Sequence, residues 1–141
     1  MDRVSGDERP LVAPAPRRNP DGSVTVPTLD AGDVRLSCPP WCVFQHGYVD
    51  PPAKTDIVHR GEPVWALADV PEHGPVSMVE VGLVQWPYSD RADVYLEITT
   101  DDGQLECGPA GSRAVAAALQ QHAGHILAMV GQLEEIRGAG R

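Results

Sequence analysis

Two cysteines and two histidines lie within 22 residues near the middle of the chain, and they constrain its fold more than any other feature. They are Cys38, Cys42, His46 and His59, in the pattern C-x3-C-x3-H-x12-H. Two thiolates and two imidazoles form the ligand set of a closed, tetrahedral structural zinc site. We therefore predict that these four side chains bind one structural Zn²⁺ ion.

A local structure that would bring the ligands together can be read from the spacing. If Pro39 starts a short helix, the first three ligands are successive i, i+4 neighbours on one face, and His59 returns on the following loop. Two alternatives stay open. The cysteines can be free or transiently oxidised, with surface histidines. The metal can also be catalytic, with three protein ligands, an open position for water and Glu62 as the general base.

The gap pattern and the charge both argue against a DNA-binding finger. In such a finger the long gap follows the second cysteine, whereas here it separates the two histidines. The chain has a formal net charge of −9, and residues 63–107 hold nine acidic side chains and one basic side chain, Arg91. An acidic surface repels phosphate backbones, so nucleic-acid binding is disfavoured. Such a charge serves solubility or attracts a basic partner.

The sequence also indicates a compartment. No segment approaches the ~20 apolar residues of a membrane span, and residues 1–20 lack the apolar core of a signal peptide. Three cysteines are an odd number, which does not suit a secreted disulfide framework. We therefore expect a soluble, cytoplasmic protein without a membrane partner.

Two regions differ in composition. Residues 1–20 contain four prolines, four arginines and no apolar periodicity, which predicts a disordered N-terminal arm. Residues 21–137 are predicted to form a single zinc-stabilised domain. Alternation in residues 23–26 and 34–36 predicts a hairpin that leads into the metal site. Residues 63–75 contain three prolines and are expected to be irregular.

From Val76 onwards, alternating apolar residues predict three strands that bury one common face. The predicted turn between the last two strands is Asp102-Gly103. The residues expected on the buried face are Val79, Val81, Leu83, Val94, Leu96, Ile98, Leu105 and Cys107.

A long helix is predicted from Pro109, with Gly108 as its N-cap, to about Ile136. Its apolar stripe has helical spacing and comprises Val115, Leu119, His122, Ile126, Met129, Val130 and Leu133. The expected fold class is α+β: a small antiparallel sheet of about four to five strands, packed by one long C-terminal helix, with a zinc-binding loop.

At the metal motif the chain resembles a group of short, uncharacterised actinobacterial proteins that share a domain of unknown function. The resemblance rests on a Cys-Pro-x-Trp-Cys element at residues 38–42, the following His46, and a His-x-Gly element at residues 59–61. It extends to the strand, Asp-Gly turn and Pro-Ala helix start in residues 94–120, and covers most of residues 33–135. The resemblance implies a domain of this kind and no reaction.

Other side chains have simpler expected roles. Trp41 and Phe44 are expected to cover the metal loop, and His73 is the substitute ligand if His46 or His59 fails. We expect a non-enzymatic, zinc-finger-like interaction or regulatory module, in which the helix or the acidic surface binds a protein partner or a second copy of the chain. A small zinc-dependent hydrolase is the first alternative, and a DNA-binding regulator, disfavoured by charge, is the second.

Overall fold

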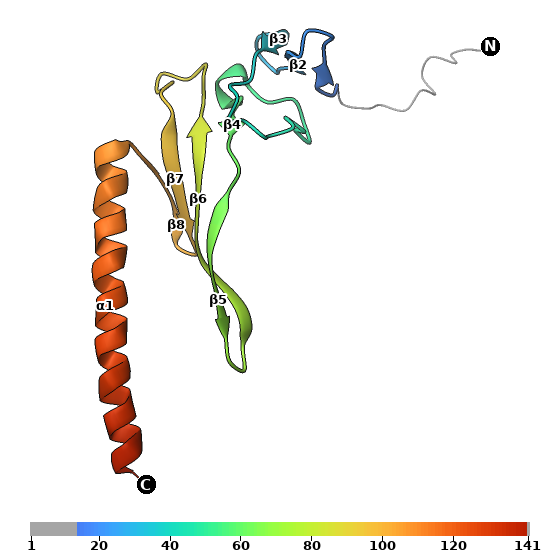
Figure 1. Ribbon diagram of the computed structural model, residues 1–141. Helices are drawn as coiled ribbons and strands as arrows, with labels where there is room; N and C mark the ends of the chain where they lie inside the picture. Colours follow the sequence, from blue (N-terminus) through green and yellow to red (C-terminus); the bar gives the residue numbers. More distant parts are fainter. Residues whose placement is uncertain (1–13, 141) are drawn as a thin grey trace, which may run out of the picture.

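The computed structural model describes residues 14–140; residues 1–13, most of the predicted arm, and residue 141 lie outside the description. It has the predicted α+β class, with a three-stranded antiparallel sheet, a five-stranded antiparallel sheet and one long C-terminal helix (Figure 1). The metal motif lies in the loop that joins the two sheets. No helix within residues 14–140 combines the length and the apolar character needed to cross a membrane.

The small sheet contains β1 (Arg17–Arg18), β2 (Val24–Pro27) and β3 (Asp33–Leu36). The predicted hairpin is β2–β3, and β1 pairs with the outer edge of β2, within the segment expected to be an arm. Apolar side chains of this sheet form the main core together with Ile57, which follows the 3-10 helix η2 (Lys54–Asp56). The members of this core are Val24, Val26, Val34, Leu36 and Ile57.

The large sheet contains β4 (His59–Arg60), β5 (Val64–Val70), β6 (Gly74–Gln85), β7 (Tyr95–Thr100) and β8 (Gly103–Cys107). Its order is β4-β6-β7-β8, and β5 also pairs with β6. The expectation of irregular structure in residues 63–75 is wrong, because β5 and the start of β6 form a hairpin there. The three prolines lie just outside β5 or near the start of β6, positions that strands tolerate.

The two faces of the large sheet differ in character. Side chains at paired positions share a face, so the register aligns Val64, Val81, Ile98 and Leu105 in one row across four strands. Leu83, Leu96 and Cys107 form the next row. These seven residues are the apolar face. The pairing confirms that they share one face, but the predicted burial of that face is only partial, because Leu83 and Leu105 are exposed. The other side carries Glu80, Thr99 and Gln104, then Gly82, Glu97 and Glu106; we call these six residues the polar face.

The turn between β7 and β8 is shifted by one residue from the prediction. Thr100 pairs with Gly103, so the two turn residues are Asp101 and Asp102. Gly103 opens β8 with a φ of 136°, a value that glycine adopts without strain.

Helix α1 (Pro109–Ala139) begins at the predicted N-cap, Gly108, whose carbonyl oxygen accepts hydrogen bonds from the backbone N–H and the side-chain hydroxyl of Ser112. The helix contacts the sheet at β7 and β8. Beyond its first turns it runs beside the sheet as a separate rod, and its C-terminal part extends past the β5–β6 hairpin (Figure 1). None of its described residues is buried, so the apolar face of the sheet is covered only in part.

Candidate metal centre

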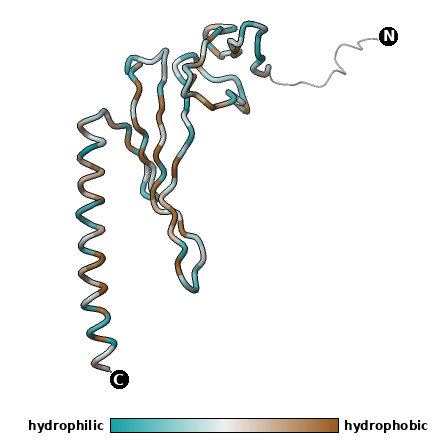
Figure 2. The backbone as a smooth tube through the Cα atoms, viewed as in Figure 1, coloured by the Kyte–Doolittle hydropathy of each residue, from teal (hydrophilic) through white to brown (hydrophobic). Residues whose placement is uncertain are grey.

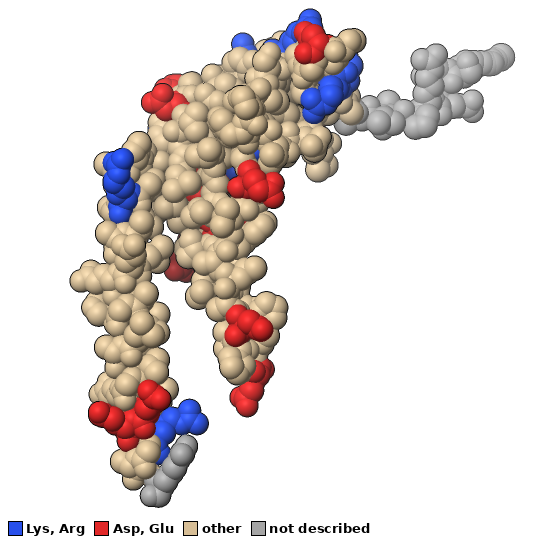
Figure 3. All heavy atoms as spheres, in the orientation of Figure 1, with Lys and Arg blue, Asp and Glu red and all other residues tan. Residues whose placement is uncertain are grey.

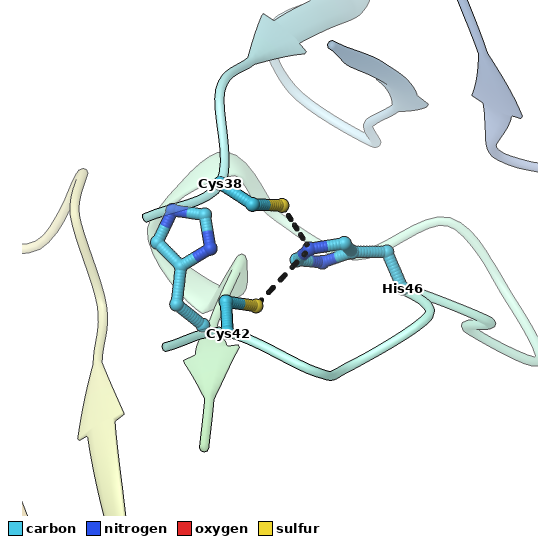
Figure 4. Close-up of side chains that lie close together, drawn as sticks. Cys38, Cys42 and His46 are labelled. Carbon is cyan, nitrogen blue, oxygen red and sulfur yellow. Dashed lines mark hydrogen bonds between the residues drawn. The ribbon is translucent and has the colours of Figure 1, made fainter. Parts of the chain in front are cut away.

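The structure brings all four predicted ligands together. One ligand atom from each of Cys38, Cys42, His46 and His59 lies within 4.8 Å of all the others. Figure 4 shows both sulfur atoms directed at the ring of His46. The distances from Nε2 of His46 are 3.2 Å to Sγ of Cys38 and 3.9 Å to Sγ of Cys42.

A turn, not a helix, holds the two cysteines side by side. The backbone N–H of Cys42 donates to the carbonyl oxygen of Pro39 at 3.0 Å, which closes a turn over the Pro-Pro-Trp segment. The predicted short helix is wrong because His46 has a φ of 55°, in the left-handed region, and the intervening residues are not helical. The chain therefore bends at His46 and returns the imidazole towards the cysteines.

The large sheet supplies the fourth candidate ligand. His59 lies in β4, opposite Gln85 of β6. The backbone N–H of Val43 donates to the carbonyl oxygen of Arg60 at 2.8 Å, so the cysteine loop is attached to β4. Gly61 follows β4, and a Cβ atom there would lie 3.4 Å from Cβ of Leu83 and 3.6 Å from the ring of Trp41. A residue without a large side chain allows this close approach.

Burial sets the protonation of the ligands in the metal-free protein. The side chains of His46 and His59 are 0% and 3% exposed. Burial, with a contribution from the nearby His59 and Arg18, lowers the pKa of His46 to about 4, and burial lowers the pKa of His59. Burial and the adjacent Cys42 raise the pKa of Cys38 to about 11. The imidazoles are therefore neutral at pH 7, as ligation requires, whereas the Cys38 thiol must release a proton.

A second layer of side chains orients the ligands. Nδ1 of His46 lies 3.4 Å from the Tyr48 hydroxyl, which also accepts the backbone N–H of Val58 at 3.2 Å. This contact leaves Nε2 directed at the cysteines, the usual arrangement of a metal-bound histidine. As predicted, aromatic rings flank the site: Phe44 packs edge-on against His46, and Trp41 against His59.

The donor set fits a metal ion. Two sulfur and two nitrogen donors that lie within 4.8 Å of one another can surround one ion tetrahedrally. Nδ1 of His59 is also buried and has no hydrogen-bond partner among residues 14–140. A buried nitrogen in that state costs free energy, and coordination of an ion is one way in which this imidazole can recover it.

The other sequence candidates lie elsewhere. Glu62 is exposed, His73 lies in the β5–β6 turn, and neither belongs to the ligand cluster. His122 and His125 are on α1. Sequence reasoning missed Tyr48, and it also missed the ion pair between Nη1 of Arg60 and Oε1 of Glu97, which are 2.6 Å apart. Only the pairing of β4, β6 and β7 brings those two side chains together.

Comparison with known proteins gives a family and nothing further. No curated protein and no solved structure matches the chain significantly. A family model does match, over residues 23–135, which include every described strand except β1, all four candidate ligands and most of α1. The chain therefore belongs to the family described as "Domain of unknown function (DUF6907)".

Proposed function

We propose that the chain is a non-enzymatic, zinc-stabilised interaction module that binds a basic segment of a protein partner. The observation that carries this proposal is the cluster of four buried or half-buried donor atoms within 4.8 Å of one another. The loop that holds three of these donors, residues 38–47, forms one wall of a groove. Zinc as the metal, a cytoplasmic location and an actinobacterial source, all expected from the sequence, belong to the same proposal.

The ligand cluster favours a structural role. Structural zinc sites have four protein ligands, whereas catalytic sites keep one position for water or substrate. Here four donors are already within 4.8 Å of one another, and the carboxylate considered as a base, Glu62, is exposed and outside the cluster. The arrangement supports a staple that holds a loop in place.

A groove of about 480 Å³ lies between the metal loop, residues 38–47, and the polar face of the large sheet. Phe44 and Val43 of the loop form one wall. Gly61 and Gly82 leave space between the walls, and Glu80 and Glu97 come from the polar face. The metal loop therefore has a direct effect on the shape of this groove.

The charge of the groove favours a basic ligand. Arg60 pairs with Oε1 of Glu97, while Oε2 of Glu97 is buried and has no hydrogen-bond partner among the described residues. Glu80 adds a second carboxylate. Two carboxylates against one guanidinium leave a net negative charge, within a segment, residues 63–107, that has a local net charge of −8. A lysine or arginine side chain can lay its apolar stem on Phe44 and direct its charge to the carboxylates.

The test is titration of the zinc-loaded, isotope-labelled chain with short oligo-arginine and oligo-lysine peptides, followed by NMR, with oligo-glutamate as the control ligand. We expect chemical-shift changes at groove residues such as Gly82 and Thr99, which weaken as salt rises. Glu80→Gln should weaken binding about tenfold, because a desolvated charge pair contributes about 1.4 kcal/mol or more.

Glu135→Gln, on the helix, is the matched control because it changes the net charge equally and lies outside the groove. Equal weakening by both substitutions, or chemical-shift changes spread over all acidic residues, would show that the peptides bind by nonspecific charge attraction and not in the groove. An absence of shifts at low salt would refute the proposal.

A further inference from the structure

Helix α1 has the composition of a buried helix and the environment of an exposed one. Residues 114–133 contain no Asp, Glu, Lys or Arg over 20 positions. Leu119 and Ile126 of the predicted stripe are nevertheless 49% and 53% exposed. A helix that is apolar on most sides is expected to be covered by other elements. Figure 2 shows apolar segments along the helix where no other element lies beside it.

The apolar face of the large sheet is also incompletely covered. In the row that crosses four strands, Ile98 is buried, whereas the outer members Val64 and Leu105 are 62% and 57% exposed. The row is therefore covered at its centre and open at both edges. A contiguous exposed apolar surface of this kind marks an interaction site.

These two surfaces face each other across an open cleft of about 530 Å³. Its sheet wall includes Val64, Met78 and Val81, and its helix wall includes Leu119, Ala123 and Ile126. In the space-filling view a deep notch separates the helix from the β5–β6 end of the sheet, and charged side chains gather at the free ends of the helix and of the β5–β6 hairpin (Figure 3). The cleft walls themselves are apolar.

The total surface is too large for a self-contained chain. The accessible surface is 10313 Å², whereas a compact monomer of 15.1 kDa exposes about 7,100 Å². Subtracting about 2,000 Å², the most that any 13 residues can expose, to leave residues 1–13 out of the comparison still gives about 1,700 Å² more than a compact body of the remaining mass exposes. That excess lies within the area, about 1,000–2,500 Å² per subunit, that an obligate homodimer buries.

We propose that the chain forms a two-fold symmetric homodimer in which α1 of each copy packs into the α1–β5–β6 cleft of the other. A second copy is the occupant that fits, because every copy offers both an apolar helix and an apolar cleft, the self-complementary condition of a two-fold interface. The uncharged stretch lets two chains of the same negative charge approach along their helices. The dimer does not depend on the metal or on the basic ligand, so it can fail while the proposed function holds.

The first experiment measures the mass of the full-length, zinc-loaded chain in solution by light scattering during gel filtration. We expect a dimer at micromolar concentration. Ile126→Glu should raise the dimer dissociation constant at least a hundredfold, because it places a charge in the cleft. Gln121→Glu introduces the same residue on the opposite side of the helix and should leave the dimer intact. A monomeric wild-type chain, or equal effects of the two variants, would overturn the proposal.

A second experiment separates exchange between copies from closure within one copy. Met78→Cys and Ile126→Cys are prepared as two separate proteins in a Cys107→Ser background, mixed with zinc present and treated with a short bifunctional thiol reagent. Peptides that link position 78 to position 126 can then form only between copies, and we expect them. If the link forms only when both cysteines are in the same chain, the helix closes on its own sheet and the dimer is refuted.

Discussion

The part of the molecule around the ligand cluster and the part around the helix reach very different degrees of packing. We define the metal half as residues 14–60 and the helix half as residues 61–140. Six of the eight buried apolar residues of the described chain belong to the metal half, although it is the shorter one. Val84 and Ile98 are the two in the helix half. Short segments therefore build the denser core here, and the longest element of the fold contributes no buried residue.

Each half compensates for its small core in a different way. The metal half converges on four donor atoms, so one ion can supply what a few apolar side chains do not. The helix half has no such group of donors among the described residues, but it has two apolar surfaces that are open. We propose a zinc ion as the stabilising partner of the metal half and a second copy of the chain as that of the helix half. Changes made to one half at a time test that division.

Loss of the metal should unfold the metal half and leave α1 largely helical. In zinc-finger peptides structural zinc contributes about 10–16 kcal/mol of apparent free energy at pH 7. We therefore expect Cys42→Ser, or treatment with a strong chelator, to abolish stoichiometric metal binding and the near-UV circular dichroism of Trp41 and Tyr48. The far-UV helical signal should decrease little. Metal content is measured by mass spectrometry.

Cys107→Ser is the matched control for this prediction, because Cys107 is the other cysteine of the chain and lies on the sheet near α1. It should keep one metal ion per chain and the wild-type unfolding curve. Full metal content and stability in the Cys42→Ser protein would remove the distinction between the two halves.

Metal affinity should fall steeply as the pH is lowered. In the metal-free protein the raised pKa of Cys38, about 11, means that its proton must leave on binding. Every proton released changes the affinity about tenfold per pH unit. The pKa of His46, about 4, lies below the ordinary 6.5, so this imidazole stays neutral and contributes no further loss until the pH approaches 4. Competition with a chromophoric chelator between pH 6 and 8 measures the slope, and a flat profile would contradict cysteine ligation.

The same pKa has a consequence for the metal-free protein. The unfolded chain protonates His46 near pH 6.5, whereas the folded chain does so only near pH 4. The contribution of His46 to the free energy of unfolding is therefore fully present above pH 6.5, and it is lost progressively as the pH falls from 6.5 to 4. Because loss of the metal is expected to unfold this half, a stabilising osmolyte is used to restore the folded state of the chelated protein, and the osmolyte concentration needed at pH 7.5 and at pH 5 measures the difference. Equal concentrations would contradict the lowered pKa of His46.

Local patterns in the sequence were sufficient for several parts of this structure. The alternation of Val81, Leu83, Leu96 and Ile98 identified one face of the sheet, and Gly108-Pro109 located the helix start, because both depend on neighbouring residues only. The ligand spacing correctly predicted that the four side chains lie together, although the predicted short helix between them is wrong. Side chains at this spacing can be brought together by more than one backbone conformation. The left-handed His46 has no sequence signal of that kind.

Long-range features were the ones that sequence reasoning missed. The prolines on either side of β5 led to the wrong prediction of irregular structure there. The Arg60–Glu97 pair joins residues that are 37 positions apart in the sequence. Burial also required the structure: the apolar face was identified correctly, but its partial exposure depends on where a helix that begins at its edge then runs. A sequence pattern shows for which apolar side chains burial is favourable. Only the three-dimensional structure shows which of those side chains are buried.

Equal truncations in the two halves should have unequal effects. Ile57 is fully buried in the core of the metal half, so Ile57→Ala should lower the free energy of unfolding by about 3 kcal/mol through lost burial and the cavity left behind. Leu127 is 72% exposed on α1 and does not line the cleft. Leu127→Ala should change the free energy by about 0.5 kcal/mol or less. Urea denaturation of both zinc-loaded variants makes the comparison, and similar losses would show that α1 is covered all round.

The smallest predicted effect is a gain in stability on replacing a helix glycine. It also tests which side of α1 contacts the second copy of the chain. Gly124 and Gly131 are helix-interior glycines at which an added Cβ would meet no atom within 4 Å, and they lie on one side of α1, away from the cleft residues Leu119 and Ile126. Gly131→Ala should therefore raise the stability of α1 by about 0.5–1 kcal/mol, because alanine loses less backbone entropy on forming a helix. The thermal midpoint of the far-UV helical signal measures this gain, and the mass in solution should stay that of the wild type. A loss of stability together with a weaker dimer would mean that the two helices meet across their glycines, so that the contact between copies uses the other side of α1 from the cleft.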